Sequence, residues 1–142
     1  MGEAGYEVIH IDEIPELTYD GQAEGTEWRP LRIHFGISSF GTNAFGARGA
    51  NEPVIAEHNE TDESGTSHEE LYYVARGHAS FTIGGEEIDA PAGTFVYVPD
   101  PDVIRSAVSQ EPKTMVLCFG GTPGEAFDVS PWEQKYDPSA AS

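Results

Sequence analysis

Histidines and carboxylates lie close together between residues 58 and 70, where their types and spacing could support metal chemistry. His58 is two residues from Glu60, and His68 is two residues from Glu70. Residues two apart share a face of an extended strand, so each histidine would lie beside a carboxylate. Imidazole and carboxylate together suit Zn, Mn, Fe or Ni, with bonds of about 2.0–2.2 Å. The stretch could therefore hold a divalent metal.

A second interpretation of the same stretch needs no metal. Both histidines could lie at exposed loop ends among solvated acidic residues. Residues 61–67 between the two pairs are polar and contain Gly65, which predicts a loop. The site would then be a metal-free pocket. The residues alone leave both interpretations open.

Short apolar runs separated by turn residues predict an all-β chain. Alternation places Leu31, Ile33 and Phe35 on one face of a predicted strand. Gly84-Gly85 is a two-residue hairpin signal. Strands recur roughly every eight to twelve residues, which is typical of a sandwich or barrel. The predicted strands are 31–37, 42–48, 54–60, 70–76, 78–83, 86–89, 94–98, 103–109 and 114–119.

Glu70 and Gly77, with six residues between them, resemble the second half of the first motif of the cupins. The resemblance covers residues 31–120 and continues through Gly84-Gly85, Pro91-Ala92-Gly93 and Val98-Pro99. In combination these features are similar to the small single-domain cupins of bacteria, the cupin-2-like conserved barrels. The resemblance implies a double-stranded jelly-roll barrel with its site inside.

Cupin metal sites use two histidines and a glutamate from the first motif and a histidine from the second. Glu70 stands at the glutamate position. At the usual spacing the other first-motif ligands would fall on Ser64 and Thr66, which are not convincing ligands. If the loop 61–67 is an insertion, His58 and Glu60 take their place. With His68 added from the second pair, the candidate metal ligands are His58, Glu60, His68 and Glu70.

The histidine of the second motif would fall on Ile104, which cannot coordinate a metal. The resemblance therefore implies a weak metal site or none. Tyr72 shares strand parity with Glu70, so Tyr72 and Ile104 are the predicted cavity-lining residues. Arg105 has the opposite parity to Ile104 and is expected to face outward. Cys118 lies in an apolar run and is expected to be a small core residue.

The chain is strongly acidic, with 25 Asp and Glu against 7 Lys and Arg and a formal net charge of −18. Such a surface repels phosphate backbones and anionic lipids, so neither nucleic acid nor a membrane is expected as a partner. The sequence shows no apolar run long enough for a membrane helix and no secretory signal. We therefore expect a cytoplasmic protein.

A length of 142 residues indicates one domain. Its expected parts are an N-terminal arm or edge strand (1–30), the cupin barrel (31–120) and a short C-terminal tail (121–142). Phe127, Trp132 and Tyr136 could pin this tail onto the barrel. We expect a homodimer, because a jelly roll leaves open sheet edges and the apolar arm could pair with a neighbour's sheet.

The sequence favours a protein that binds a small molecule in the barrel cavity, with a divalent metal held weakly or not at all. The alternative is a metal-dependent cupin enzyme of the dioxygenase or isomerase type, with His58, His68 and Glu70 as ligands. A third interpretation, a barrel that binds a protein partner, rests on the tail aromatics. The fold cannot choose among these functions, because unrelated activities occur on one fold.

Overall fold

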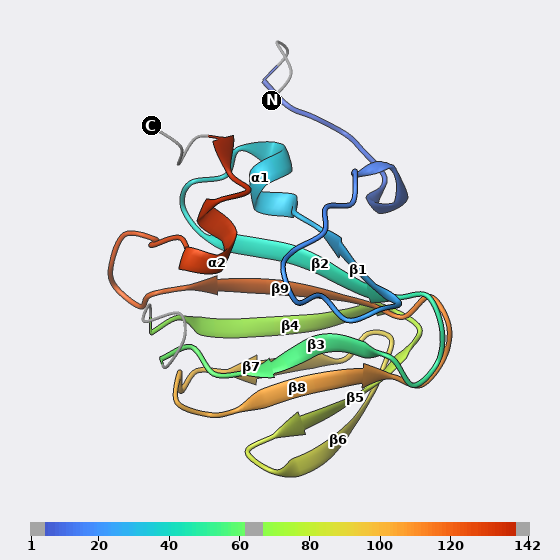
Figure 1. Ribbon diagram of the computed structural model, residues 1–142. Coiled ribbons are helices and arrows are strands. Elements are labelled where there is room, and N and C mark those ends of the chain that lie inside the picture. Colours follow the sequence, from blue (N-terminus) through green and yellow to red (C-terminus); the bar gives the residue numbers. More distant parts are fainter. Residues whose placement is uncertain (1–4, 62–66, 139–142) are drawn as a thin grey trace.

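Two antiparallel sheets form the body of the protein in the computed structural model, which describes residues 5–61 and 67–138 (Figure 1). The five-stranded sheet has the order β1 (Thr26–Arg29), β2 (Gly41–Ala47), β9 (Met115–Gly121), β4 (Glu69–Arg76) and β7 (Phe95–Val98). The four-stranded sheet has the order β3 (Pro53–His58), β8 (Arg105–Ser109), β5 (His78–Ile83) and β6 (Glu86–Pro91). The predicted all-β jelly roll is confirmed.

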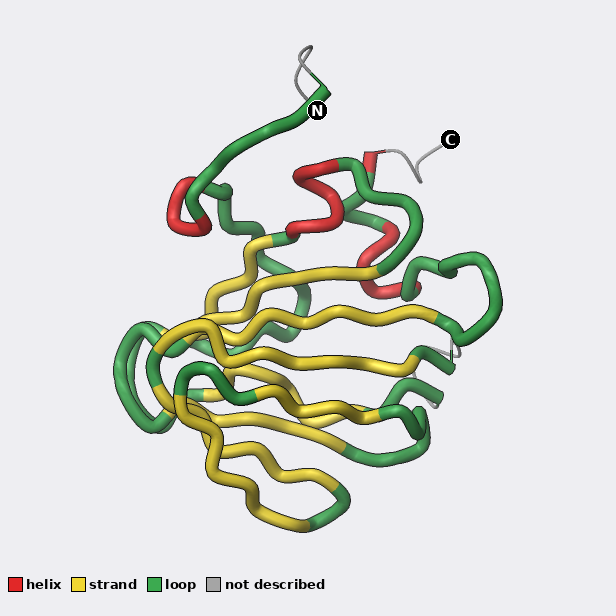
Figure 2. Tube along the Cα trace, turned by 180° about the vertical axis from the view of Figure 1, so that it is seen from behind, coloured by secondary structure: helices red, strands yellow, loops and turns green. Residues whose placement is uncertain are grey.

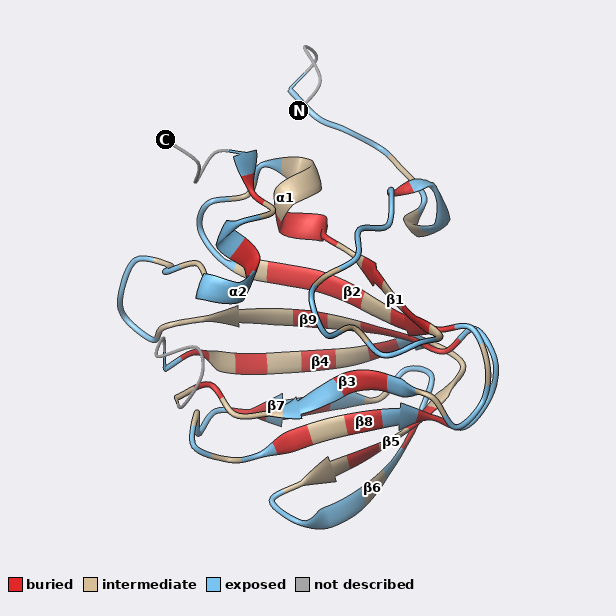
Figure 3. Cartoon of the chain, viewed as in Figure 1, coloured by how far each residue is buried: buried red, intermediate tan, exposed pale blue. Residues whose placement is uncertain are grey.

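The inner faces of the two sheets share one apolar core. Burial alternates along β4 and β8, as the period of a half-buried strand requires (Figure 3). Tyr72 and Val74 of the five-stranded sheet join Phe81 and Ala107 of the four-stranded sheet in this core. Burial of each large apolar side chain stabilises the fold by about 1.5–3 kcal/mol.

Glycines allow two of the turns between strands. Gly77, with a φ of +79°, connects β4 to β5, and a Cβ atom there would lie 2.4 Å from the Thr114 hydroxyl oxygen. Gly84 and Gly85 have φ values of +56° and +89°, which suit the tight hairpin between β5 and β6. The hairpin predicted from these two glycines is confirmed.

The strand predicted over 31–37 is wrong, because Leu31–Phe35 form a short helix, α1. Gly36 ends this helix in the left-handed conformation, with a φ of +72°. The alternating pattern was ambiguous, since the first and last residues of the helix are four apart and also share a helical face. Both pack in a small cluster on the outer face of the five-stranded sheet. The strand of this region lies earlier, at β1.

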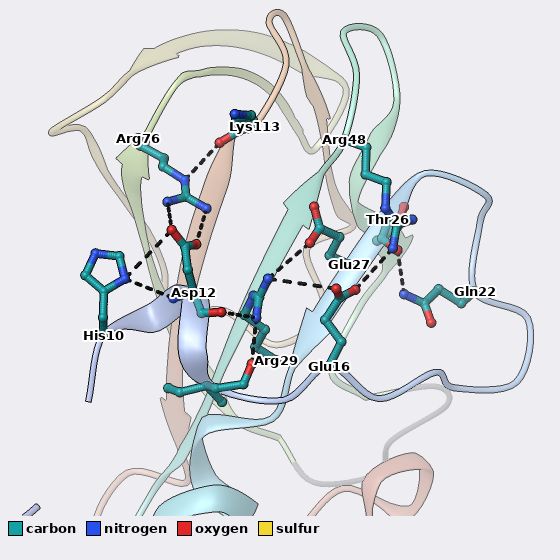
Figure 4. A network of polar contacts seen from close by, with 11 residues as sticks. His10, Asp12, Glu16, Gln22, Thr26, Glu27, Arg29, Arg48, Arg76 and Lys113 are labelled. Carbon is teal, nitrogen blue, oxygen red and sulfur yellow. Dashed lines mark hydrogen bonds and ion pairs between the residues drawn. The ribbon is translucent and has the colours of Figure 1, made fainter. Parts of the chain in front are cut away.

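The N-terminal arm packs on its own chain and includes a short 3-10 helix, η1 (Ile11–Glu13). Arg29 donates to the carbonyl oxygen of Ile14 at 2.6 Å, and Arg76 Nη2 donates to Asp12 Oδ1 at 2.8 Å (Figure 4). The arm therefore contacts the sheet of its own chain. The homodimer stays a prediction. The apolar cluster under the arm contains Ile9, Ile11, Ile14, Leu31, Ala44 and Met115.

A buried arginine anchors the C-terminal segment, which includes helix α2 (Pro131–Gln134). Arg32 Nε donates to Glu133 Oε2 at 2.6 Å, and Arg32 Nη2 donates to Asp137 Oδ2 at 2.5 Å. All three side chains are buried. Asn43 accepts from the Trp28 indole at 2.9 Å and donates to Glu133 Oε1 at 3.0 Å. Helices α1 and α2 lie on the β2 side of the five-stranded sheet, away from the four-stranded sheet (Figure 1 and Figure 2).

Aromatic rings complete this attachment. The rings of Trp132 and Tyr136 lie 5.1 Å and 5.3 Å from the Trp28 ring, and Phe127 stacks on His68 at 5.1 Å. The prediction that these aromatics pin the tail is confirmed. No helix among the described residues is long and apolar enough to cross a membrane.

Replacing Arg32 by Met should lower the free energy of unfolding by about 3–5 kcal/mol, because two buried carboxylates lose their cation. Urea denaturation measures this loss. Arg48→Met is the control, since the Arg48 side chain is 60% exposed where it meets Glu16. Its effect should stay within about 0.5 kcal/mol. Equal effects for both variants would contradict the anchoring role of Arg32.

Candidate ligand and metal site

A cavity of about 360 Å³ is lined by strands of both sheets and by the C-terminal segment. The cavity is lined by all four predicted metal ligands, His58, Glu60, His68 and Glu70. Tyr72, which was predicted to face inward like Glu70, also lines it. His58 ends β3, and Glu70 and Tyr72 lie on β4 with the parity expected from the sequence. The ligand positions Ser64 and Thr66, given by the usual motif spacing, lie outside the described residues.

Glycines leave room for the larger groups of the site. Gly120 pairs with Glu70 across the sheet, and a Cβ atom on Gly120 would lie 3.4 Å from Glu70 Cγ. A Cβ atom on Gly41 would lie 2.9 Å from the Phe127 ring. The cavity wall therefore depends on two glycines that the motif did not identify. In the sequence, only the presence of a glycine within a strand could have indicated such a close approach.

Glu70 is a buried carboxylate with donors on three strands. Its Oε1 accepts from the Tyr72 hydroxyl at 2.5 Å and from Arg105 Nη1 at 2.7 Å. Its Oε2 accepts from Cys118 Sγ at 3.3 Å. Burial and the neighbouring Glu70 charge raise the pKa of the Tyr72 hydroxyl and of the Cys118 thiol well above their usual ranges. Both groups therefore stay protonated and donate to Glu70.

His58 lies between two carboxylates. Its Nε2 is 3.0 Å from Glu60 Oε2 and 3.6 Å from Glu70 Oε1. Its Nδ1 is 2.8 Å from the carbonyl oxygen of Ala56, so Nδ1 carries a proton and donates it. Burial alone would lower the pKa of His58, but the hydrogen bonds to Glu60 and Glu70 outweigh it and raise the pKa to about 10. His58 is thus an imidazolium at neutral pH.

Glu60 also contacts the second histidine, His68. His68 Nδ1 lies 3.5 Å from Glu60 Oε1, and the His68 ring is buried. Burial would raise the pKa of Glu60, yet its contacts with His58 and His68 lower it to about 2. His68 Nε2 is buried and has no hydrogen-bond partner among the described residues. That nitrogen is available to a bound molecule or metal.

The orientations predicted for Ile104 and Arg105 are reversed. The Ile104 residue is 51% exposed and is not among the residues that line the cavity, whereas Arg105 is fully buried. β8 begins at Arg105, and Arg105, Ala107 and Ser109 form its buried face. The sequence was ambiguous here because Ala107 and Val108 put apolar residues on both faces, and a one-residue shift exchanges the faces. Cys118 is buried as expected, and it also contacts Glu70.

The donor set fits a divalent metal. One ligand atom from each of His58, Glu60 and Glu70 can be chosen so that all lie within 4.8 Å of one another. An imidazole and two carboxylates are suitable donors, and His68 Nε2 adds an unpaired buried nitrogen. Two features oppose metal binding: the proton on His58 and the guanidinium of Arg105 on Glu70. The residues therefore fit a metal that must compete for its site.

Comparison with solved structures identifies the fold as that of the cupins, as the Glu70–Gly77 motif predicted. The polyketide cyclase RemF from Streptomyces resistomycificus matches with a TM-score of 0.62 and 17% identity, over 95% of this chain and 96% of that chain. A cupin protein from Bacteroides fragilis matches with a TM-score of 0.59 and 17% identity, over 91% and 94%. A sugar phosphate isomerase from Silicibacter pomeroyi matches with a TM-score of 0.62 and 16% identity, over 82% of this chain and 77% of that chain. No family model and no curated protein sequence matches the chain.

In metal-free protein the His58 imidazole should titrate near pH 10, and Glu60→Gln should move the pKa down toward 6.5. NMR of the imidazole carbons measures both. Because the folded pKa lies above 6.5, the stability that this contact provides is complete below about pH 6.5 and is lost as the pH rises through about 10. Asp89→Asn, which removes a surface partner of His78, should leave the His58 titration unchanged. A parent His58 pKa near 6.5 would contradict this arrangement.

Proposed function

We propose that the protein binds a small polar organic molecule in the cavity between its sheets. The observation that carries this proposal is the meeting of His58, Glu60, Glu70 and Tyr72 in a cavity of about 360 Å³. That volume lies within the roughly 300–1,000 Å³ typical of small-molecule sites. The cavity also combines a few polar groups with aromatic side chains in its lining, which is typical of such sites.

The polar groups supply complementary chemistry to a ligand. His58 is a proton donor held against two carboxylates, and Glu60 is an acceptor whose pKa is lowered to about 2. The unpaired His68 Nε2 offers another hydrogen-bonding position. A ligand hydroxyl could donate to the Glu60 carboxylate, while a second polar group of the ligand satisfies His68 Nε2. The same groups could transfer a proton to a bound oxygen, as in general acid catalysis.

The second candidate function is a metal-dependent enzyme of the isomerase or dioxygenase type. It is favoured by the group formed by His58, Glu60 and Glu70, which does not include His68. A bound divalent ion would supply Lewis-acid polarisation of a substrate oxygen. The structural neighbours include an isomerase and a cyclase, so the fold does not select one reaction.

The binding proposal is tested by a thermal-shift panel of sugars, sugar acids, keto acids, amines and nucleosides, measured with chelator present. At least one compound should raise the melting temperature of the parent. The shift should be largely lost in His58→Gln and in Tyr72→Phe, which remove polar groups of the cavity. His78→Gln is the matched control, since His78 pairs with Asp89 at the surface. Shifts that survive both cavity variants would place binding elsewhere.

Any metal should be weakly held and should depend on Glu70 and on at least one of His58 and His68. Metal retained after dialysis against a mild chelator should fall at least roughly tenfold in Glu70→Gln. Retention should increase as the pH rises toward about 10, because the His58 proton must leave before Nε2 can coordinate. Ile104→His should give no gain, because Ile104 is 51% exposed. Equal retention by Glu70→Gln and the parent would contradict the ligand assignment.

A further inference from the structure

Arg105 is a fully buried cation beside the cavity. It lies on β8, opposite His58 of β3 and opposite Ile83 of β5. This position is one residue after Ile104, where the resemblance to cupins placed the metal ligand of the second motif. The inward position next to His58 therefore carries a guanidinium instead of a metal ligand.

The guanidinium is held in a fixed orientation by the chain just before β8. Arg105 Nε donates to the carbonyl oxygen of Val103 at 2.8 Å, and Nη2 donates to that of Asp100 at 3.2 Å. These bonds direct Nη1 to Glu70 Oε1 at 2.7 Å. Arginine stays protonated in proteins, so this positive charge is permanent.

The hydrogen bonds of Glu70 use both lone-pair directions of one of its two oxygens. Arg105 and Tyr72 both donate to Glu70 Oε1, and a carboxylate oxygen has about two lone-pair directions. The other oxygen, Oε2, accepts from Cys118. A metal that bound Glu70 Oε1 would have to displace Tyr72 or Arg105, of which Arg105 carries a charge, whereas Oε2 keeps a second lone-pair direction.

Glu70 also has a permanent counter-charge without a metal. Arg105 neutralises Glu70, and His58 contacts Glu60 with 3.0 Å between Nε2 and Oε2. A divalent ion held by His58, Glu60 and Glu70 would lie close to the guanidinium. Because Arg105 is 0% exposed, water and salt would screen that repulsion poorly.

We propose that Arg105 is a positioning residue that excludes divalent metal from this cavity and keeps the site in a metal-free state for an organic ligand. This inference rests on the proposed binding function of the cavity. Arg105 then supplies the permanent obstacle to metal, since suitable atoms of His58, Glu60 and Glu70 already lie within 4.8 Å of one another.

The test is calorimetric titration of Zn²⁺ alone into chelator-stripped protein. Arg105→Met, which keeps an unbranched side chain but removes the guanidinium and its charge, should bind Zn²⁺ roughly 10–100-fold more tightly than the parent. Arg105→Lys keeps the charge and should show little gain. The double variant Arg105→Met with Glu70→Gln should lose the gain, which assigns it to Glu70. No gain in a folded Arg105→Met protein, or an equal gain in Arg105→Lys, would overturn the proposal.

A second measurement avoids the risk that Arg105→Met fails to fold. The Arg105 Nε–H resonance of the parent should keep its chemical shift and its protection from exchange when Zn²⁺ is added in excess. Displacement of this resonance by one equivalent of tightly bound Zn²⁺ would overturn the proposal. Neither measurement uses an organic ligand, so failure of the ligand panel would count against the proposed function alone.

Discussion

The buried carboxylate of Glu70 is the constraint on which the polar interior depends. A charge removed from water is costly unless it is paired and hydrogen-bonded. Glu70 finds its donors on three strands: Tyr72 on β4, Arg105 on β8 and Cys118 on β9. Because β4 and β9 belong to one sheet and β8 to the other, satisfying this one side chain also ties the two sheets together.

The distribution of the few basic residues follows the same requirement. The chain has 7 Lys and Arg for 25 Asp and Glu, yet two arginines, Arg32 and Arg105, are buried. Arg105 pairs with Glu70, and Arg32 pairs with both Glu133 and Asp137. Each buried cation thus pairs with carboxylates in the interior. The remaining acidic excess lies mainly where water can solvate it, and its self-repulsion is screened by salt.

Much of the fold could be predicted from the sequence, because alternation and turn residues act locally. The hairpin at Gly84 and Gly85 and the inward face of Glu70 and Tyr72 followed from period and motif. Helix α1 could not be predicted, because its apolar spacing suits a strand and a helix equally. Which of Ile104 and Arg105 faces inward depends on the register of β8 against β3, which is a tertiary property.

The site was predictable in its residue types but not in its charge state. A motif identifies Glu70 and nearby histidines as donors, and the same donors suit a metal or a set of hydrogen bonds. Whether the site holds a metal depends on which cation neutralises Glu60 and Glu70, two carboxylates that are close together and largely buried. In this chain a proton on His58 and the guanidinium of Arg105 provide that positive charge. A divalent ion would be a third candidate for the same task, so the choice between the two proposed functions becomes a competition among cations for Glu60 and Glu70. A sequence motif does not decide that competition, because Arg105 is 35 residues from Glu70 along the chain and meets it only in the folded protein.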